Sequence, residues 1–172
     1  MAVYQYYLAV VPVTGILKRR SSKPEFIRVS TKTGFFESDA EIYWKEIEIK
    51  ADGILPKIDN IIKRDEWGND KTSFNWKSDT GEIDNDASIF LDEQKSTIVE
   101  FSFRADLREE NLTFLMNMIE LGKELNWMFM DRSGKIMDPD FKELKISIQN
   151  SNAYNFLSDP KKFLESIAKN AK

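Results

Sequence analysis

The chain contains neither cysteine nor histidine among its 172 residues. Without cysteine it can form no disulfide and no thiolate metal site, and without histidine it lacks the usual general base near neutral pH. These absences exclude zinc sites of the Cys/His type and the hydrolase mechanisms that need an imidazole base. Catalysis by paired carboxylates, by lysine or tyrosine, or by carboxylate-bound Mg²⁺ remains open.

Long hydrophobic runs are also missing. The apolar stretch from Tyr6 to Val13 contains Pro12, and no basic residue precedes it. A signal peptide would have a basic start and a longer apolar run, and a membrane-spanning helix would need roughly 20 apolar residues. We therefore expect this stretch to be the first strand of a cytoplasmic protein with no membrane partner.

The chain has no excess of positive charge. It carries 25 Lys and Arg against 29 Asp and Glu, a net charge of −4, and its pI is about 5.1. Clustered cations supply most of the affinity of general nucleic-acid-binding proteins, so this balance argues against a nucleic-acid partner. It is compatible with an acidic surface that recognises a basic partner.

The remaining composition indicates a folded chain. Aromatic residues make up 12% of the sequence, far more than a disordered chain would carry. The length is typical of one core, and we find no linker and no repeat, so we expect residues 1–172 to form a single domain.

Alternation of apolar and polar residues predicts several strands. The clearest runs from Val99 to Asp106, with one apolar face and one charged face, and we expect it to form a hairpin with residues 87–91. The other predicted strands are residues 4–11, 26–29, 74–77, 127–130 and 135–137. Residues 40–49 fit either a strand or a helix.

Helical spacing predicts the intervening elements. Isoleucines between residues 54 and 64 share one helical face. A longer helix with a broad apolar arc is expected to follow Asp106, which could cap it. The pairs Asp138-Pro139 and Asp159-Pro160 predict two further helix starts, although residues 144–148 could also alternate as a strand.

These elements predict an α+β fold in which helices pack on an antiparallel sheet. Over residues 4–130 their order can be read as β-α-β-β-α-β, which is the ferredoxin-like order. The last two predicted helices would then form a C-terminal helical extension.

The densest group of carboxylates lies in the turn-rich segment 78–86. Carboxylate oxygens can hold Ca²⁺ or Mg²⁺, but an EF-hand starting at Asp84 would have Ile89 and Lys95 where glycine and glutamate are needed. We predict no metal site and no cofactor, and interpret this segment as a solvated loop or a protein-binding surface. The predicted partner contacts are Trp76, Asp79, Glu82, Asp84 and Asp86. Trp67, also near a turn, is a further candidate for an interface.

The polar face of the predicted strand 99–106 is the alternative site. Glu100, Arg104 and Arg108 would line it, and either arginine could bind a carboxylate or phosphate through two parallel hydrogen bonds. The competing interpretation is a plain solvent-exposed sheet face. The basic residues between Lys18 and Lys23 are interpreted as a solvated loop, because no glycine-rich phosphate motif accompanies them.

One set of stretches carries a family resemblance: WK at 76–77, DNDA at 84–87, EFSFRADLRE at 100–109, MDRSGK at 130–135 and SNAYNFLSDPKKFLESI at 151–167. These stretches resemble a group of small cytosolic bacterial proteins. In general character that group is similar to the immunity proteins of polymorphic-toxin and contact-dependent inhibition systems. The resemblance implies a non-enzymatic cytoplasmic protein that binds a toxin domain and occludes its active site. The alternative hypothesis is a small enzyme or ligand-binding domain built on Glu100, Arg104 and Arg108.

Overall fold

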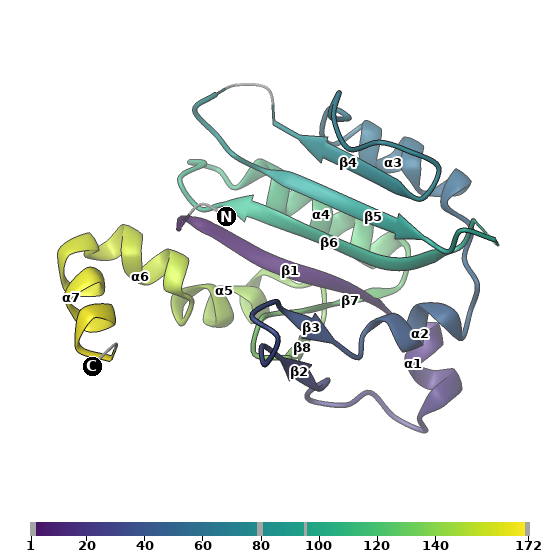
Figure 1. The fold of residues 1–172 in the computed structure, drawn as a ribbon, viewed down its shortest axis with the longest axis horizontal. Helices are drawn as coiled ribbons and strands as arrows, with labels where there is room; N and C mark the ends of the chain where they lie inside the picture. Colours follow the sequence, from purple (N-terminus) through teal and green to yellow (C-terminus); the bar gives the residue numbers. More distant parts are fainter. Residues whose placement is uncertain (1–2, 79–80, 95, 171–172) are drawn as a thin grey trace.

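A six-stranded antiparallel sheet in the order β4-β5-β6-β1-β7-β8 forms the centre of the protein (Figure 1). It is seen in a computed structural model that describes residues 3–78, 81–94 and 96–170, without the side chains of 167–170. The strands are β1 (Gln5–Pro12), β4 (Ser73–Lys77), β5 (Asp86–Leu91), β6 (Ile98–Asp106), β7 (Trp127–Met130) and β8 (Ile136–Met137). A separate ribbon pairs β2 (Val29–Ser30) with β3 (Glu37–Ser38).

Helices lie on both sides of this sheet. They are α1 (Val13–Arg19), α2 (Glu41–Lys45), the short 3₁₀ helix η1 (Ala51–Gly53), α3 (Leu55–Asp59), α4 (Thr113–Glu124), α5 (Phe141–Gln149), α6 (Asn152–Ser158) and α7 (Pro160–Asn170). Helices α3, α4 and α5 contribute to the core on one side, and α1, α2 and the β2–β3 ribbon cover part of the other. The predicted α+β class is confirmed.

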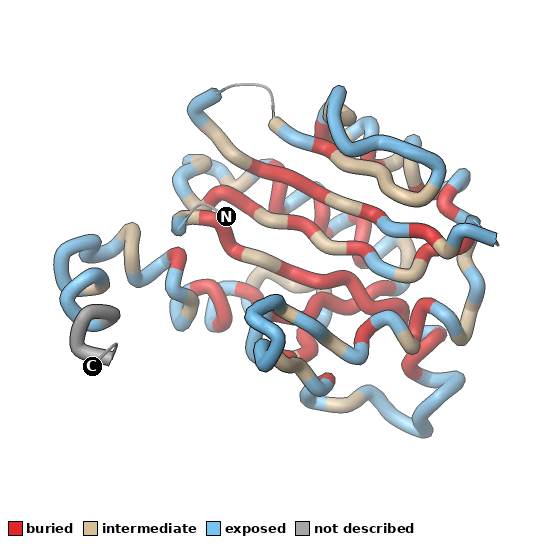
Figure 2. Tube along the Cα trace, viewed as in Figure 1, coloured by how far each residue is buried: buried red, intermediate tan, exposed pale blue. Residues whose placement is uncertain are grey.

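Two hydrophobic cores flank the sheet, and Figure 2 shows buried residues running along the central strands. The first core, on the α4 side, includes Leu8, Phe103 and Ile119. The second core, under α1 and α2, includes Val11 and Ile16. Strand β1 therefore has both of its faces buried, because successive side chains point to opposite sides of a strand.

The four central strands lie in the order β5-β6-β1-β7, which a split β-α-β-β-α-β unit gives. Strands β4 and β8 add to both edges of the sheet, and α1, α2 and the β2–β3 ribbon are inserted into the first connection. The ferredoxin-like topology therefore stays a prediction.

The predicted cap of the long helix is wrong. Asp106 ends β6, and α4 begins only at Thr113, after Leu112 in the left-handed conformation with φ 48°. The carboxylate of Asp106 pairs with Arg108 instead, so it cannot cap the helix. Glu109 takes this role instead, because its Oε2 accepts a hydrogen bond from the backbone N–H of Phe114 at 3.3 Å.

The C-terminal helices differ from prediction in their starts. Helix α5 begins after Asp140, whose side chain accepts from the backbone N–H of Lys142, so Asp138 is not the cap. Asp159 does precede α7 as predicted, and it accepts from the backbone N–H of Lys162 at 3.0 Å. Helices α1 and α6 are additional, and the helix predicted over 54–64 is confined to Leu55–Asp59.

Helices α6 and α7 extend away from the end of the sheet as a C-terminal arm (Figure 1). Their contact with each other includes the rings of Phe156 and Phe163, whose centroids lie 5.9 Å apart in an edge-to-face arrangement. Within the described ranges, no helix is long and apolar enough to cross a lipid bilayer.

Candidate protein-binding face

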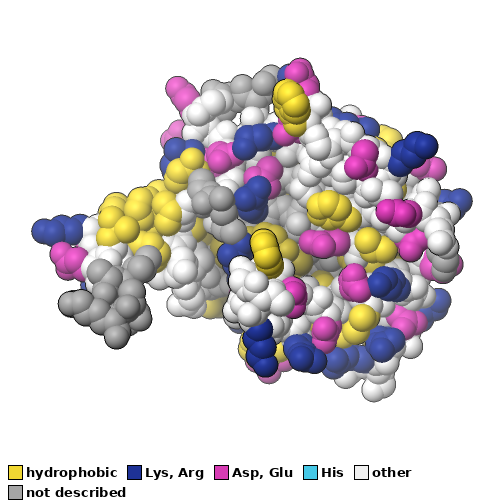
Figure 3. Space-filling model, viewed as in Figure 1, with side chains coloured by type: hydrophobic (Ala, Val, Ile, Leu, Met, Phe, Trp, Pro, Cys, Tyr) yellow, Lys and Arg dark blue, Asp and Glu magenta, His cyan; other side chains and the backbone are white. Residues whose placement is uncertain are grey.

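The solvent side of β4, β5 and β6 forms what we call the open face. Among the described residues, helix α2 lies against β6 near Glu100, and α1 and the β2–β3 ribbon stand over β1, so the rest of this side carries no helix (Figure 1). The alternation predicted for β6 is confirmed, since Phe101, Phe103 and Ala105 are buried. The side chains that line the open face are Asn75, Ser88, Phe90, Glu100, Ser102 and Arg104. Figure 3 shows carboxylates interspersed with hydrophobic side chains over the middle of this side of the molecule.

Exposed aromatic side chains stand on and around the open face. Phe90 projects from β5, Phe35 lies in the turn of the β2–β3 ribbon, and Trp67 lies in the loop before β4. Phe35 is 77% exposed and Trp67 is 81% exposed, although both side chains are large and apolar. Exposed aromatics of this size are enriched at protein interfaces.

The loop that carries Trp67 is held in place by hydrogen bonds to β4. The carbonyl of Gly68 accepts from Nδ2 of Asn75 at 2.5 Å and from Oγ of Ser73 at 2.8 Å. Gly68 has a φ of 72°, which a side chain would disfavour. The exposed indole therefore stands on an ordered turn.

Arg104 is engaged inside the protein. Its Nε lies 2.8 Å from Oδ1 of Asp86 on the neighbouring strand, and Nε2 of Gln5 donates to Oδ2 of the same carboxylate at 3.0 Å. Burial raises the pKa of Asp86, and the hydrogen bond from Arg104 opposes that rise. The guanidinium of Arg104 thus compensates a buried carboxylate.

Arg108 is engaged in the same way with Asp106, a residue that is 0% exposed. Nη2 of Arg108 lies 2.6 Å from Oδ2 of Asp106 and also donates to the carbonyl of Glu82 at 2.8 Å. Burial opposes ionisation of Asp106, but the hydrogen bonds from Arg108 and from the backbone of Asp84 outweigh it and lower the pKa. The guanidinium also stacks over the Tyr4 ring, 3.5 Å from its centroid. Arg108 therefore fastens segment 82–84 to the end of β6.

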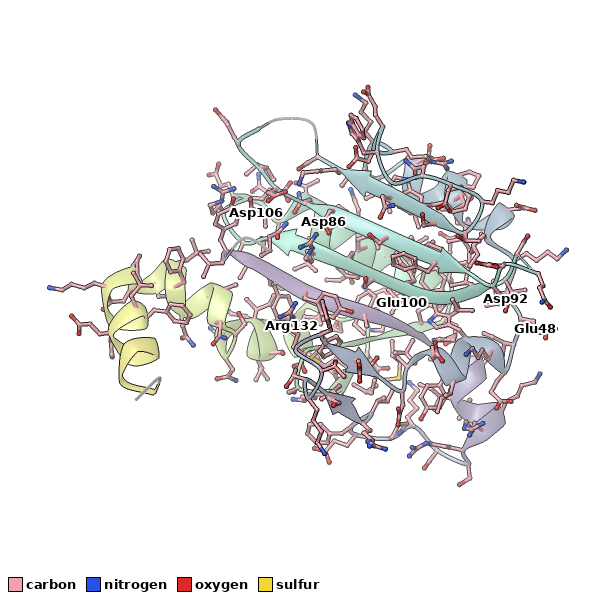
Figure 4. All side chains as sticks on the ribbon, viewed as in Figure 1. Glu48, Asp86, Asp92, Glu100, Asp106 and Arg132 are labelled. Atoms are coloured by element: carbon pink, nitrogen blue, oxygen red, sulfur yellow. The ribbon has the colours of Figure 1, made fainter. Side chains whose placement is uncertain are left out.

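The structure separates the three residues of the predicted ligand face. Asp86 and Asp106, which hold Arg104 and Arg108, lie toward one end of β6, and Glu100 lies toward the other (Figure 4). The two arginines thus belong to internal ion pairs, and only Glu100 is left without a cation in the described residues.

The predicted partner contacts differ in whether they are accessible to a partner. Trp76 requires a correction, because it is only 1% exposed and its Nε1 donates to Asp59 at 2.7 Å inside the first core. Asp86 is buried in its ion pair, and Asp84 is paired with Lys77 at 2.9 Å. Glu82 is exposed, and Asp79 lies outside the described residues.

A small pocket of about 230 Å³ opens beside Glu100, and we call it the acidic pocket. Carboxylates and aromatic rings from β1, from β6 and from residues 36–44 converge on it. They are Tyr7, Phe36, Glu37, Glu41, Trp44, Glu100 and Phe101. The sequence does not reveal this pocket, because its residues are spread over nearly a hundred positions and share no local pattern.

The electrostatics of the acidic pocket favour a cation. Partial burial and the negative charge of Glu41 raise the pKa of Glu100. Burial and the charge of Glu100 also raise the pKa of Tyr7 to about 12. No group of three or more carboxylates in the described residues is arranged to hold a metal ion.

No family model, curated protein or solved structure matches the chain.

Proposed function

We propose that this protein acts by binding another protein through its open face, and that it is not an enzyme. The observation that supports this most directly is the carboxylate of Glu100, which lies in the acidic pocket at the edge of the open face without a cation among the described residues. Its raised pKa means that its charge is disfavoured in the free protein. A lysine or arginine of a partner would offset this cost, because an opposite charge favours the ionised carboxylate.

The aromatic side chains around the open face supply the apolar part of such an interface. Phe35, Trp67 and Phe90 can each be covered by a partner, and aromatic anchors of this kind commonly contribute most of the binding energy. The internal pairing of Arg104 and Arg108 supports the same conclusion, since carboxylates of the protein already occupy the two arginines that an anionic substrate on the predicted ligand face would need.

We further propose that the partner is the basic surface of a bacterial toxin domain, which the open face occludes in the cytoplasm. The resemblance to immunity proteins supports this choice of partner. The net charge of −4 supports it as well, because a complementary acidic surface accelerates association with a basic one.

The test is a binding measurement between the full-length chain and the purified protein encoded by the neighbouring gene. We expect Glu100→Lys to weaken binding at least about tenfold, since it places a like charge against the basic partner. Phe35→Ala and Trp67→Ala should each weaken binding several-fold. Glu120→Lys is the matched control, because Glu120 lies exposed on α4 at the opposite side of the sheet.

Equal binding by the Glu100→Lys and Glu120→Lys variants would show that the open face is not the contact. Surface plasmon resonance at two salt concentrations separates the charge effect from a folding defect, because only the former weakens with screening. Circular dichroism of each variant provides the check of the fold.

A further inference from the structure

A second, larger cleft lies between the body of the protein and the C-terminal arm. Its volume is about 540 Å³, which falls in the range of small-molecule sites. The first residues of β1, the turn between β7 and β8, the α5–α6 junction and Phe163 of α7 surround it. The cleft adjoins the acidic pocket at Tyr7, but its chemistry is different.

A continuous chain of hydrogen bonds forms the floor of the cleft. The hydroxyl of Tyr6 donates to Oγ of Ser147 at 2.8 Å, and Ser147 donates to Oδ2 of Asp131 at 2.5 Å. Oδ1 of Asp131 accepts from the backbone N–H of Ser133 at 2.8 Å. Burial raises the pKa of Tyr6, so its phenol stays neutral. This floor is fully engaged and fixes the position of α5 against the sheet.

The walls of the cleft are largely apolar. Val3 just before β1, Ala153 on α6 and Phe163 on α7 contribute to them, together with the ring of Tyr6. Phe163 is held by its edge-to-face contact with Phe156. A ligand in the cleft would therefore bury an apolar body.

Arg132 stands at the cleft without a counterion. Its guanidinium carbon lies 5.2 Å from the centroid of Tyr7 and 5.8 Å from that of Phe36. Among the residues that the structure describes, no carboxylate pairs with it. Burial lowers its pKa, and Arg104 adds a further positive charge nearby. This arginine differs from Arg104 and Arg108, each of which holds a carboxylate.

We propose that this cleft binds a small amphipathic anion, with its apolar body against Val3, Ala153 and Phe163 and its acidic head at Arg132. The planar guanidinium can hold a carboxylate through two parallel hydrogen bonds. The apolar walls supply the rest of the affinity, because burying the ligand's hydrocarbon removes it from water. Charge complementarity thus selects an anion over a neutral molecule of the same shape.

The experiment titrates the full-length chain with octanoate, octan-1-ol and acetate while ¹H–¹⁵N spectra are recorded. We expect octanoate to shift the amides of Val3, Ala153 and Phe163 saturably and to bind at least about tenfold tighter than octan-1-ol, the difference that a charge-assisted hydrogen bond provides. Acetate should not saturate, because it lacks the apolar body.

Two variants test where the acidic head and the apolar body of the ligand bind. Arg132→Gln should remove the preference for octanoate over octan-1-ol, whereas Arg28→Gln, at an exposed arginine outside the cleft, should leave it unchanged. Asn152→Trp adds bulk to the cleft lining and should abolish binding of both ligands. Absence of saturable shifts in the unmodified protein, or a preference for octanoate that survives Arg132→Gln, would overturn the proposal.

Discussion

At the scale of single residues, two buried carboxylates near the open face respond to pH in opposite ways. The lowered pKa of Asp106 means that its stabilising contribution is present above the pKa of the unfolded chain and is lost as pH falls through the folded value. The raised pKa of Asp86 has the opposite effect, so its contribution is present at low pH and is lost as pH rises through the folded value. The difference arises because Asp106 receives more hydrogen bonds to its charged form.

Glu100 has a raised pKa with no compensating cation, and this leads to a prediction about the free protein. We expect Glu100→Gln to raise the free energy of unfolding at pH 7 by about 0.5 kcal/mol, a small value because solvent still reaches and screens this partly exposed charge. The gain should vanish near pH 3, where Glu100 is protonated in both states, because a raised pKa costs stability only as pH rises through it. Urea denaturation at the two pH values measures both effects.

Glu120→Gln is the control for this measurement, and it should change stability little at either pH. A Glu100→Gln variant that is less stable than the unmodified protein at pH 7 would contradict the electrostatic description of the acidic pocket. If substitution of Glu100 both raised stability and weakened partner binding, it would follow that this residue serves binding at a cost in stability.

At the scale of elements, the contact between α1 and α2 depends on a glycine. A Cβ atom added at Gly15 would lie 2.0 Å from the backbone oxygen of Tyr43, a distance that no side chain can occupy. Glycine costs helix stability relative to alanine, yet here it lets two helix backbones approach closely. This contact holds α1 and α2 together where they pack on β1 and form the second core.

Gly15→Ala should therefore destabilise the protein by about 2 kcal/mol, because the added methyl group forces the two helices apart. The matched control is Gly53→Ala in η1, where a Cβ atom would meet no atom within 4 Å. Thermal unfolding followed by circular dichroism compares the two variants. If both variants melted at the same temperature, the close approach of α1 and α2 would not limit stability.

Local patterns predicted those elements whose residues interact mainly with their sequence neighbours. Strands β6 and β7 and helix α7 agree with prediction because alternation, a short apolar run and an Asp-Pro start are visible in the sequence. The start of α4 did not follow its local signal, because the buried pair of Asp106 with Arg108 withdraws the predicted cap. Helix α1 was not predicted, since no capping side chain precedes it and Gly15 has a low helix propensity.

At the scale of the whole molecule, β1 joins the two cores. Leu8 and Val10 face the first core, and Ala9 and Val11 face the second. Loss of either core exposes one face of the same central strand, so we expect the sheet and both helical layers to unfold together. Coincident transitions by different probes are the test of such two-state behaviour.

Substitutions in each core check this cooperativity. Ile16→Ala in the second core and Ile119→Ala in the first should each lower the free energy of unfolding by about 3 kcal/mol, because both residues are fully buried. Trp44, Trp76 and Trp127 lie in the first core, so their fluorescence reports on it. A fluorescence transition that Ile16→Ala leaves unmoved would show that the two cores unfold separately.

The sequence by itself determined the α+β class, most of the strands, and the exclusion of imidazole and thiolate chemistry, because these depend on composition and on local periodicity. Only the tertiary structure decided which charged groups are available for binding. Arg104 and Arg108 are neutralised by carboxylates that the sheet brings alongside them, whereas Glu100 and Arg132 have no such partner among the described residues. The physical reason is that an ion pair depends on which side chains the fold makes neighbours, and residue order alone does not show this.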